Sequence, residues 1–121
     1  HRRLVPVTRH LCDRALLARM RPDALLVNTS RAELIAPGAL LAALEAGRPG
    51  MAALDVFEQE PAVPQREPLL THPRVLAMPH LGYVEQDSYA LYLGTALDNA
   101  RAFADGTPRN LVNPEALTRN R

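Results

Sequence analysis

The chain has 121 residues and a formal net charge of +1, with acidic and basic residues interspersed along its length. A chain of this length is the size of one domain and can bury more than half of its unfolded surface in a core. Aromatic residues make up 4% of the sequence, and Trp is absent. With no basic face and little material for base stacking, the composition argues against nucleic acid as a partner.

The single cysteine, Cys12, leaves no partner for an internal disulfide and falls short of a structural zinc pattern. No apolar run approaches the roughly 18 residues of a membrane span, and no charged-then-apolar leader opens the sequence. We therefore expect a cytoplasmic protein with no metal centre and no membrane partner. The sequence starts without Met, in what reads as the end of a strand running into a loop over residues 1–8, and this predicts a fragment.

The first helix is predicted over residues 13–20. Asp13 suits its first turn, and Leu16, Leu17 and Met20 lie on one apolar face. A short apolar run follows at residues 24–28, and its side chains do not alternate between apolar and polar. This pattern is typical of a strand that is buried on both faces of a parallel sheet.

The second helix is predicted to have Pro37 as its first helical residue and to close at Gly47. Further short strands are predicted at residues 52–56 and 75–78, the latter stopped by a proline that is tolerated at a strand end. The loop over residues 57–68 is long, polar and rich in Pro and Glu. Such a loop is expected to lie on the surface or to line a cleft.

The last helix is predicted over residues 85–104, where apolar residues recur at three- and four-residue steps before Gly106 ends it. Helices that alternate with short buried strands indicate an α/β fold built on a doubly wound parallel sheet. The sequence contains no Gly-x-Gly-x-x-Gly turn after a strand. It also lacks the acidic residue that would follow such a turn and bind a ribose.

Ionisable side chains follow each of the three predicted strands. Arg31 follows the first strand, Asp55 near the end of the second strand or Glu60 after it is the candidate there, and His80 follows the third strand. Parallel strands end at one edge of a sheet, and such sheets bind ligands beyond that edge. We therefore expect these side chains to converge on one rim.

Four motifs, in order along the chain, carry a resemblance to a known family. They are His1–Arg9 (HRRLVPVTR), Asn28–Arg31 (NTSR), Ala53–Pro61 (ALDVFEQEP) and Pro79–Gly82 (PHLG). Together they closely resemble the NAD-dependent D-2-hydroxyacid dehydrogenases, over nearly the whole chain. The resemblance implies the second half of a Rossmann-type NAD-binding domain over residues 1–83. Residues 84–121 would then form a helix and tail that return toward the substrate domain.

The resemblance also implies roles for individual residues. Arg31 would bind the substrate carboxylate, His80 would act as the acid/base, and Glu60 would be the carboxylate behind the histidine. Asp55 would face the nicotinamide carboxamide. The residues along the cofactor would be Arg2, Thr29, Ser30, Arg31, Asp55, His80, Gly82 and Tyr83. The choice between NAD and NADP depends on a ribose contact that this sequence does not contain.

These residue types suit the oxidation of a 2-hydroxy acid or the reduction of a 2-keto acid. The imidazole of His80 titrates near neutrality and can exchange a proton with the substrate oxygen. A carboxylate beside it orients the ring and favours its protonated form. Glu60 is the candidate for that carboxylate, and Glu58, two residues away, is the alternative. Arg31 offers a planar fork that can grip a carboxylate with two charge-assisted hydrogen bonds.

The chain departs from the family pattern beside the expected site. Where members often have Gly-Gly after the arginine, this chain has Ala32 and Glu33, and Tyr83 follows Gly82 where many members have a small residue. Side chains replace bare backbone at both places, so the pocket and the substrate are expected to differ.

Two functions remain open on the sequence alone. One is the catalytic half of a dehydrogenase, and the other is a truncated product or dinucleotide-binding interaction module with no turnover of its own. In either case, half of a doubly wound sheet would leave a strand edge and apolar surface bare, which predicts self-association.

Overall fold

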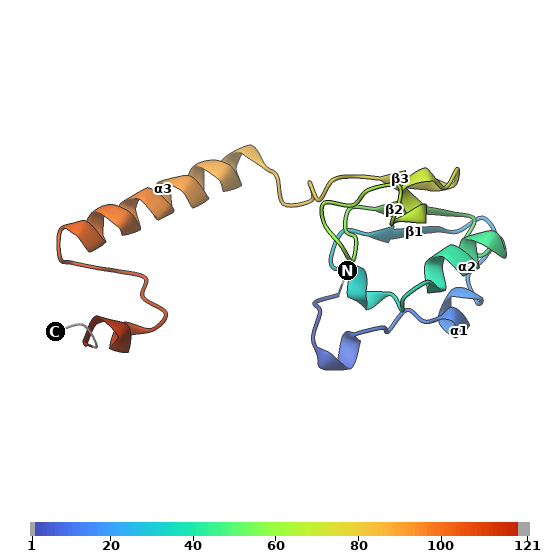
Figure 1. Cartoon of the computed structure of the whole chain (residues 1–121), viewed down its shortest axis with the longest axis horizontal. Helices are drawn as coiled ribbons and strands as arrows, with labels where there is room; N and C mark the ends of the chain where they lie inside the picture. The colour runs from blue at the N-terminus through green and yellow to red at the C-terminus, as the bar shows by residue number, and fades with distance from the viewer. Residues whose placement is uncertain (1, 119–121) are drawn as a thin grey trace. The chain divides into compact units, whose positions relative to one another are not determined.

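The computed structural model describes residues 2–118, so His1, with which the first motif begins, lies outside the described residues. The chain divides into two compact units, of which the first ends at Gly82 and the second begins at Tyr83. Figure 1 shows the first unit as a small sheet with helices and the second as a long helix with a tail. Each unit is described by itself.

The first unit is built on a three-stranded sheet in the order β1-β2-β3. Its strands are β1 (Leu25–Asn28), β2 (Met51–Leu54) and β3 (Val75–Ala77), and both pairs are parallel. In the register, Asn28 lies opposite Leu54, which lies opposite Ala77. The predicted α/β fold with a parallel sheet is therefore confirmed, and the three strands end at the same edge.

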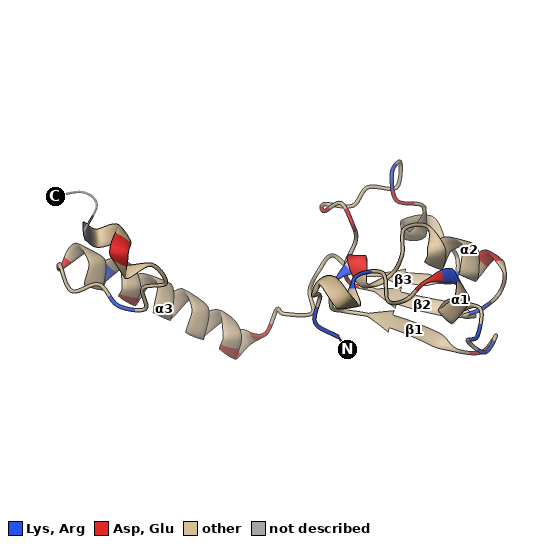
Figure 2. Ribbon diagram, turned by 90° about the horizontal axis from the view of Figure 1, so that it is seen from below, with Lys and Arg blue, Asp and Glu red and all other residues tan. Residues whose placement is uncertain are grey.

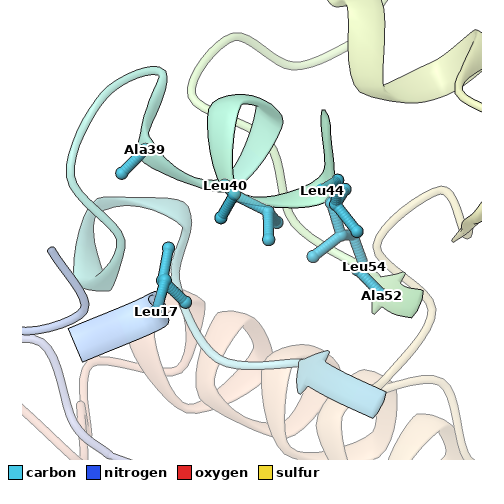
Figure 3. Packing of buried hydrophobic residues seen from close by; sticks show 7 residues of the cluster. Leu17, Ala39, Leu40, Leu44, Ala52 and Leu54 are labelled. Carbon is cyan, nitrogen blue, oxygen red and sulfur yellow. The ribbon is translucent and has the colours of Figure 1, made fainter. Parts of the chain in front are cut away.

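Two short helices, α1 (Arg14–Leu17) and α2 (Ala39–Glu45), complete the core of this unit. Leu17 and Leu44 are almost completely buried, and they pack with Leu40 and with Ala52 and Leu54 of β2 (Figure 3). Helix α1 starts after Asp13, whose carboxylate accepts a hydrogen bond from the Leu16 N–H at 2.8 Å. It ends at Leu17, three residues before the predicted end.

The opposite face of the sheet differs from the prediction. Leu25, Val27, Met51 and Leu76 are between 54% and 63% exposed. The register places Leu25 beside Met51, and Leu76 beside Ala53, on that face. The expectation that β1 is buried on both faces is therefore wrong for this chain, because α1 and α2 both pack on the same face of the sheet.

The ends of α2 are set by two glycines. Gly38 precedes the helix in a left-handed conformation with φ +66°, so the helix begins at Ala39 and the prediction of Pro37 as its first residue is wrong. At the other end, Gly47 has φ +79°, and the N–H groups of Gly47 and Arg48 donate to the carbonyls of Leu44 and Ala43. This is a Schellman motif, and it confirms the predicted end of the helix at Gly47.

Short 3₁₀ helices fill the connections of the first unit. They are η1 (Pro6–Thr8), η2 (Ala32–Leu34) and η3 (Pro68–Thr71). No strand occurs in residues 2–8, so the strand end predicted there is wrong over the described part of that segment. Pro6 begins η1 instead, and the turn closes where the Thr8 N–H donates to the Val5 carbonyl at 2.9 Å.

The second unit contains α3 (Gln86–Ala104) and η4 (Pro114–Thr118). Helix α3 begins one residue after the predicted start and ends where predicted. Its apolar residues Leu93 and Leu97 are exposed, whereas Ala102 is buried. Acidic and basic residues are interspersed along the chain in Figure 2. Within residues 2–118, no helix combines the length and the apolar character that crossing a bilayer requires.

Candidate active site

The contact at the centre of the site joins the loops that follow β2 and β3. Nδ1 of His80 lies 2.6 Å from Oε2 of Glu60, and the two side chains are 35% and 36% exposed. The second carboxylate oxygen of Glu60 accepts a hydrogen bond from the Phe57 N–H at 3.0 Å. Of the two carboxylates that the sequence offered, Glu60 is the one in contact with the imidazole.

The electrostatics of this contact act on the glutamate. The Phe57 amide and then the His80 side chain hold the pKa of Glu60 below its ordinary value, because both donate hydrogen bonds to its ionised form. Glu60 is therefore an ionised partner that can hold a proton on the facing nitrogen of His80. The other ring nitrogen, Nε2, is then the atom that could exchange a proton with a ligand.

Asp55 is bonded to the backbone that follows His80. It is 5% exposed, and its two carboxylate oxygens accept hydrogen bonds from the backbone N–H groups of Leu81 at 2.7 Å and Gly82 at 2.6 Å. Its own N–H donates to the Asn28 carbonyl at 3.0 Å. Asp55 thus connects the ends of β1 and β2 to the residues that follow His80.

Asn28 organises the exit from β1, and the sequence analysis did not identify it as a site residue. Its buried side chain accepts a hydrogen bond from the Ser30 N–H at 3.1 Å and donates one to the Arg31 carbonyl at 2.9 Å. An Asn at a strand end followed by a polar loop is a recognised signal for such an Asx turn, and it could have identified this residue.

The other predicted residues of this loop lie around the Asx turn. Ser30 Oγ donates to the Arg2 carbonyl at 2.6 Å, and Nη1 of the exposed Arg31 donates to the Ser30 carbonyl at 2.7 Å. A Cβ placed on Gly82 would lie 3.7 Å from the Thr29 Cβ, so these two loops approach each other.

Arg31 and Tyr83 are the remaining predicted site residues. Within residues 2–118, Arg31 makes its side-chain hydrogen bond to Ser30 rather than to His80 or Glu60. Tyr83 belongs to the second unit and is exposed. The roles predicted for Arg31, Tyr83 and the other site residues all stay predictions.

A cavity of about 310 Å³ lies at the carboxyl end of β1. Its walls combine the apolar side chains of Leu11, Leu26 and Ile35 with polar groups of Arg2, Thr29 and Ser30. Apolar walls with a few polar groups suit one aromatic and sugar-bearing part of a dinucleotide, so these residues fit part of such a cofactor. Among the described residues, no group of three or more His, Cys, Asp or Glu side chains could hold a metal ion.

Comparison with known proteins gives a family match over most of the chain. Residues 1–82 match the sequence model of the family described as D-isomer specific 2-hydroxyacid dehydrogenase, NAD binding domain. The glyoxylate/hydroxypyruvate reductase B of Enterobacter agglomerans is 40% identical over 115 residues, which are 94% of this chain and 35% of that protein. The chain thus spans about a third of the length of the curated relatives it matches.

The chain is also similar to solved structures of dehydrogenases over most of its length. An oxidoreductase from Ralstonia solanacearum, provisionally assigned as a D-3-phosphoglycerate dehydrogenase, is 47% identical with a TM-score of 0.90, over 97% of this chain and 34% of that one. The D-lactate dehydrogenase of Lactobacillus jensenii, solved with NAD⁺, is 28% identical with a TM-score of 0.73, over 93% of this chain and 37% of that one.

Proposed function

Because the chain belongs to the D-isomer specific 2-hydroxyacid dehydrogenase family, through its NAD-binding domain, we propose that it is the catalytic part of an NAD-dependent oxidoreductase. The reaction would transfer a hydride between a D-2-hydroxy acid and the cofactor. The observation that carries the proposal is the 2.6 Å contact between the His80 imidazole and the Glu60 carboxylate beyond the sheet's carboxyl edge.

His80 is the proposed acid/base. In the direction of reduction it gives a proton to the ketone oxygen, and in the direction of oxidation it takes the hydroxyl proton. Glu60 fixes the ring by holding Nδ1, and the proposed proton exchange with the substrate uses the other ring nitrogen, Nε2. When bound, NAD supplies the nicotinamide carbon that accepts or donates the hydride.

Arg31 is the proposed carboxylate clamp. The Asx turn made by Asn28 holds the backbone of Arg31 at the exit from β1, while its guanidinium is exposed and able to reorient. A guanidinium can grip the substrate carboxylate with two hydrogen bonds and hold the reacting carbon in place. Lys would be a poor replacement because it lacks the planar fork.

The proposed cofactor contacts surround the cavity at β1 and the loop after His80. They are made by Arg2, Thr29, Ser30, Arg31, Asp55, His80, Gly82 and Tyr83. Glyoxylate, hydroxypyruvate and D-lactate appear in the names of the relatives, and all belong to the 2-keto or 2-hydroxy acids proposed as substrates here. Residues 84–121 would form the helix and tail that return toward a substrate domain.

The test is a chimera in which this chain replaces the matching segment of the Enterobacter agglomerans reductase, to which it is 40% identical. The folded chimera, checked by circular dichroism, should oxidise NADH with a panel of 2-keto acids. The 121-residue chain alone should bind NADH weakly and turn over nothing. A folded chimera without turnover would instead favour a non-catalytic binding module.

In the chimera, Arg31→Ala should lower kcat/KM by about 100-fold to 1,000-fold, by analogy with the loss of an oxyanion-hole donor. Arg19→Ala, at another exposed arginine, is the matched control and should leave turnover unchanged. Steady-state kinetics with a 2-keto acid measures both. Equal turnover in the Arg31→Ala and Arg19→Ala chimeras would remove Arg31 from the site.

A further inference from the structure

We propose that Asp55 is a positioning residue for the acid/base, and that its buried carboxylate holds His80 in place through the backbone N–H groups of Leu81 and Gly82. The inference rests on the proposed function only in calling His80 the acid/base. The contacts themselves can be tested without turnover.

The Asp55 carboxylate is buried and fully engaged by hydrogen bonds, as a positioning role requires. At 5% exposure it has left bulk water, which is costly for a charged group unless hydrogen bonds replace the lost hydration. The two successive backbone donors, at 2.7 Å and 2.6 Å, provide that replacement, and hydrogen bonds to a charged acceptor are the stronger kind. Successive N–H groups that converge on one anion form the arrangement called a nest.

His80 needs such support because of its backbone. Its φ of +57° lies in the left-handed region, which side-chain-bearing residues occupy at a cost and keep only where the surroundings hold them there. The two N–H groups bound by Asp55 come directly after this residue. The Asp55 carboxylate therefore stabilises the turn that aims the imidazole at Glu60.

Gly82 shows how closely the two segments fit. A Cβ on Gly82 would lie only 2.8 Å from Oδ2 of Asp55, so the bare backbone is what allows the carboxylate to approach the N–H. Two residues beyond Asp55, the Phe57 N–H holds the other member of the pair, Glu60. The exit from β2 thus fixes both His80 and its carboxylate.

The first test is hydrogen exchange, measured by NMR on the 121-residue chain and its Asp55→Asn variant. Asn has nearly the same shape but carries no charge, and its amide group cannot accept both hydrogen bonds. We expect the Leu81 and Gly82 amides to exchange about 10-fold to 100-fold faster, as the loss of a hydrogen bond to a charged group implies. Met78, whose N–H donates to the Leu54 carbonyl at 2.8 Å, should keep its protection.

The control is Asp23→Asn, at an exposed aspartate that pairs with Arg21 before β1 begins, which should leave both amides unchanged. Unchanged exchange at Leu81 and Gly82 in Asp55→Asn would overturn the proposal. Equal acceleration at Met78 would overturn it as well, because Asp55 would then support the whole sheet rather than the turn.

The second test asks whether the imidazole moves, and uses the Glu60 carboxyl as the reporter. The negative charge of Asp55 by itself raises the pKa of Glu60, whereas the His80 contact lowers it. Removing only the charge must therefore lower the pKa of Glu60. We expect the opposite in Asp55→Asn, a rise seen by carbon NMR of the carboxyl, because the released His80 no longer donates to Glu60. A fall would overturn the proposal.

Discussion

At the scale of single residues, the pKa of Glu60 reports on whether its contact with His80 is formed. The glutamate has two donors, the Phe57 N–H and the His80 ring, and both lower its pKa. Because the folded-state pKa is depressed, the stabilisation from these contacts is present above the unfolded-state pKa. It is lost as the pH falls through the folded-state pKa.

We predict that His80→Asn raises the pKa of Glu60 without restoring its ordinary value, because the Phe57 N–H remains. Asn tolerates the left-handed conformation at this position, so the backbone can keep its course. His10→Asn is the matched control, since His10 also has a positive φ, of +59°. Its backbone N–H donates to the Glu33 carbonyl, so it takes no part in the contact with Glu60. Carbon NMR titration of the Glu60 carboxyl gives the answer, and an unchanged value in His80→Asn would contradict the contact.

A second residue-scale constraint lies where the chain enters β2. A Cβ on Gly50 would lie 1.9 Å from the carbonyl oxygen of Pro22, which belongs to the backbone and cannot rotate away. Gly50→Ala should therefore destabilise the first unit by about 1–3 kcal/mol, as overpacking does. Urea unfolding measures the loss.

Gly94→Ala serves as the control for Gly50→Ala, because a Cβ there would meet nothing within 4 Å. Gly94 lies in α3, in the second unit, so the unfolding of the sheet should not change. Equal stability of Gly50→Ala and the unmodified chain would mean that the approach of Gly50 to Pro22 is not maintained in solution.

At the scale of elements, two adjacent leucines of α1 differ in burial although their side chains are the same. Leu17 is 1% exposed and packs against α2, whereas Leu16 is 44% exposed. Leu17→Ala should lower the free energy of unfolding by about 2–5 kcal/mol, since it removes buried methyl groups and leaves a cavity.

Leu16→Ala is the internal comparison and should cost about 1 kcal/mol or less, because only about half of that side chain leaves water. Both variants keep the Asp13 cap, which bonds the backbone of residue 16 rather than its side chain. Denaturant unfolding should rank the two clearly. Similar losses in both variants would contradict the packing of α1 on α2.

At the scale of the whole molecule, the uncovered face of the sheet governs the behaviour of the chain in solution. Leu25, Val27, Met51 and Leu76 form one apolar surface across three strands. Contiguous apolar surface of this kind marks a site of association. β1 is also an edge strand within the three-stranded sheet, and edge strands offer unpaired backbone groups to other chains.

We predict that the 121-residue chain self-associates, and that Val27→Lys combined with Leu76→Lys shifts it toward the monomer by placing charges on this face. Leu16→Lys, on the exposed side of α1, should leave the association unchanged. Sedimentation velocity over a concentration series distinguishes the three proteins. A wild-type chain that stays monomeric throughout would refute the prediction.

The sequence by itself determined the order of strands and helices, the parallel sheet and the family, because apolar runs, helix-ending glycines and short motifs are local properties of the chain. It also identified His80 and Glu60 as candidates, since each follows a predicted strand. It misplaced the start of α2 because the left-handed conformation of Gly38 separates Pro37 from the helix. It missed Asn28, although an Asn at a strand end before a polar loop is a local signal for an Asx turn.

The tertiary structure decided what local pattern does not contain. Only the fold selects Glu60 over Glu58 as the neighbour of His80, because the loop after β2 must curve back for one carboxylate to reach the imidazole. Only the fold brings Asp55 to the N–H groups of Leu81 and Gly82, which lie 26 and 27 positions further along the chain. The fold also leaves one face of β1 exposed. The sequence could not show this, because an apolar run is the same whether one layer of helices covers the sheet or two.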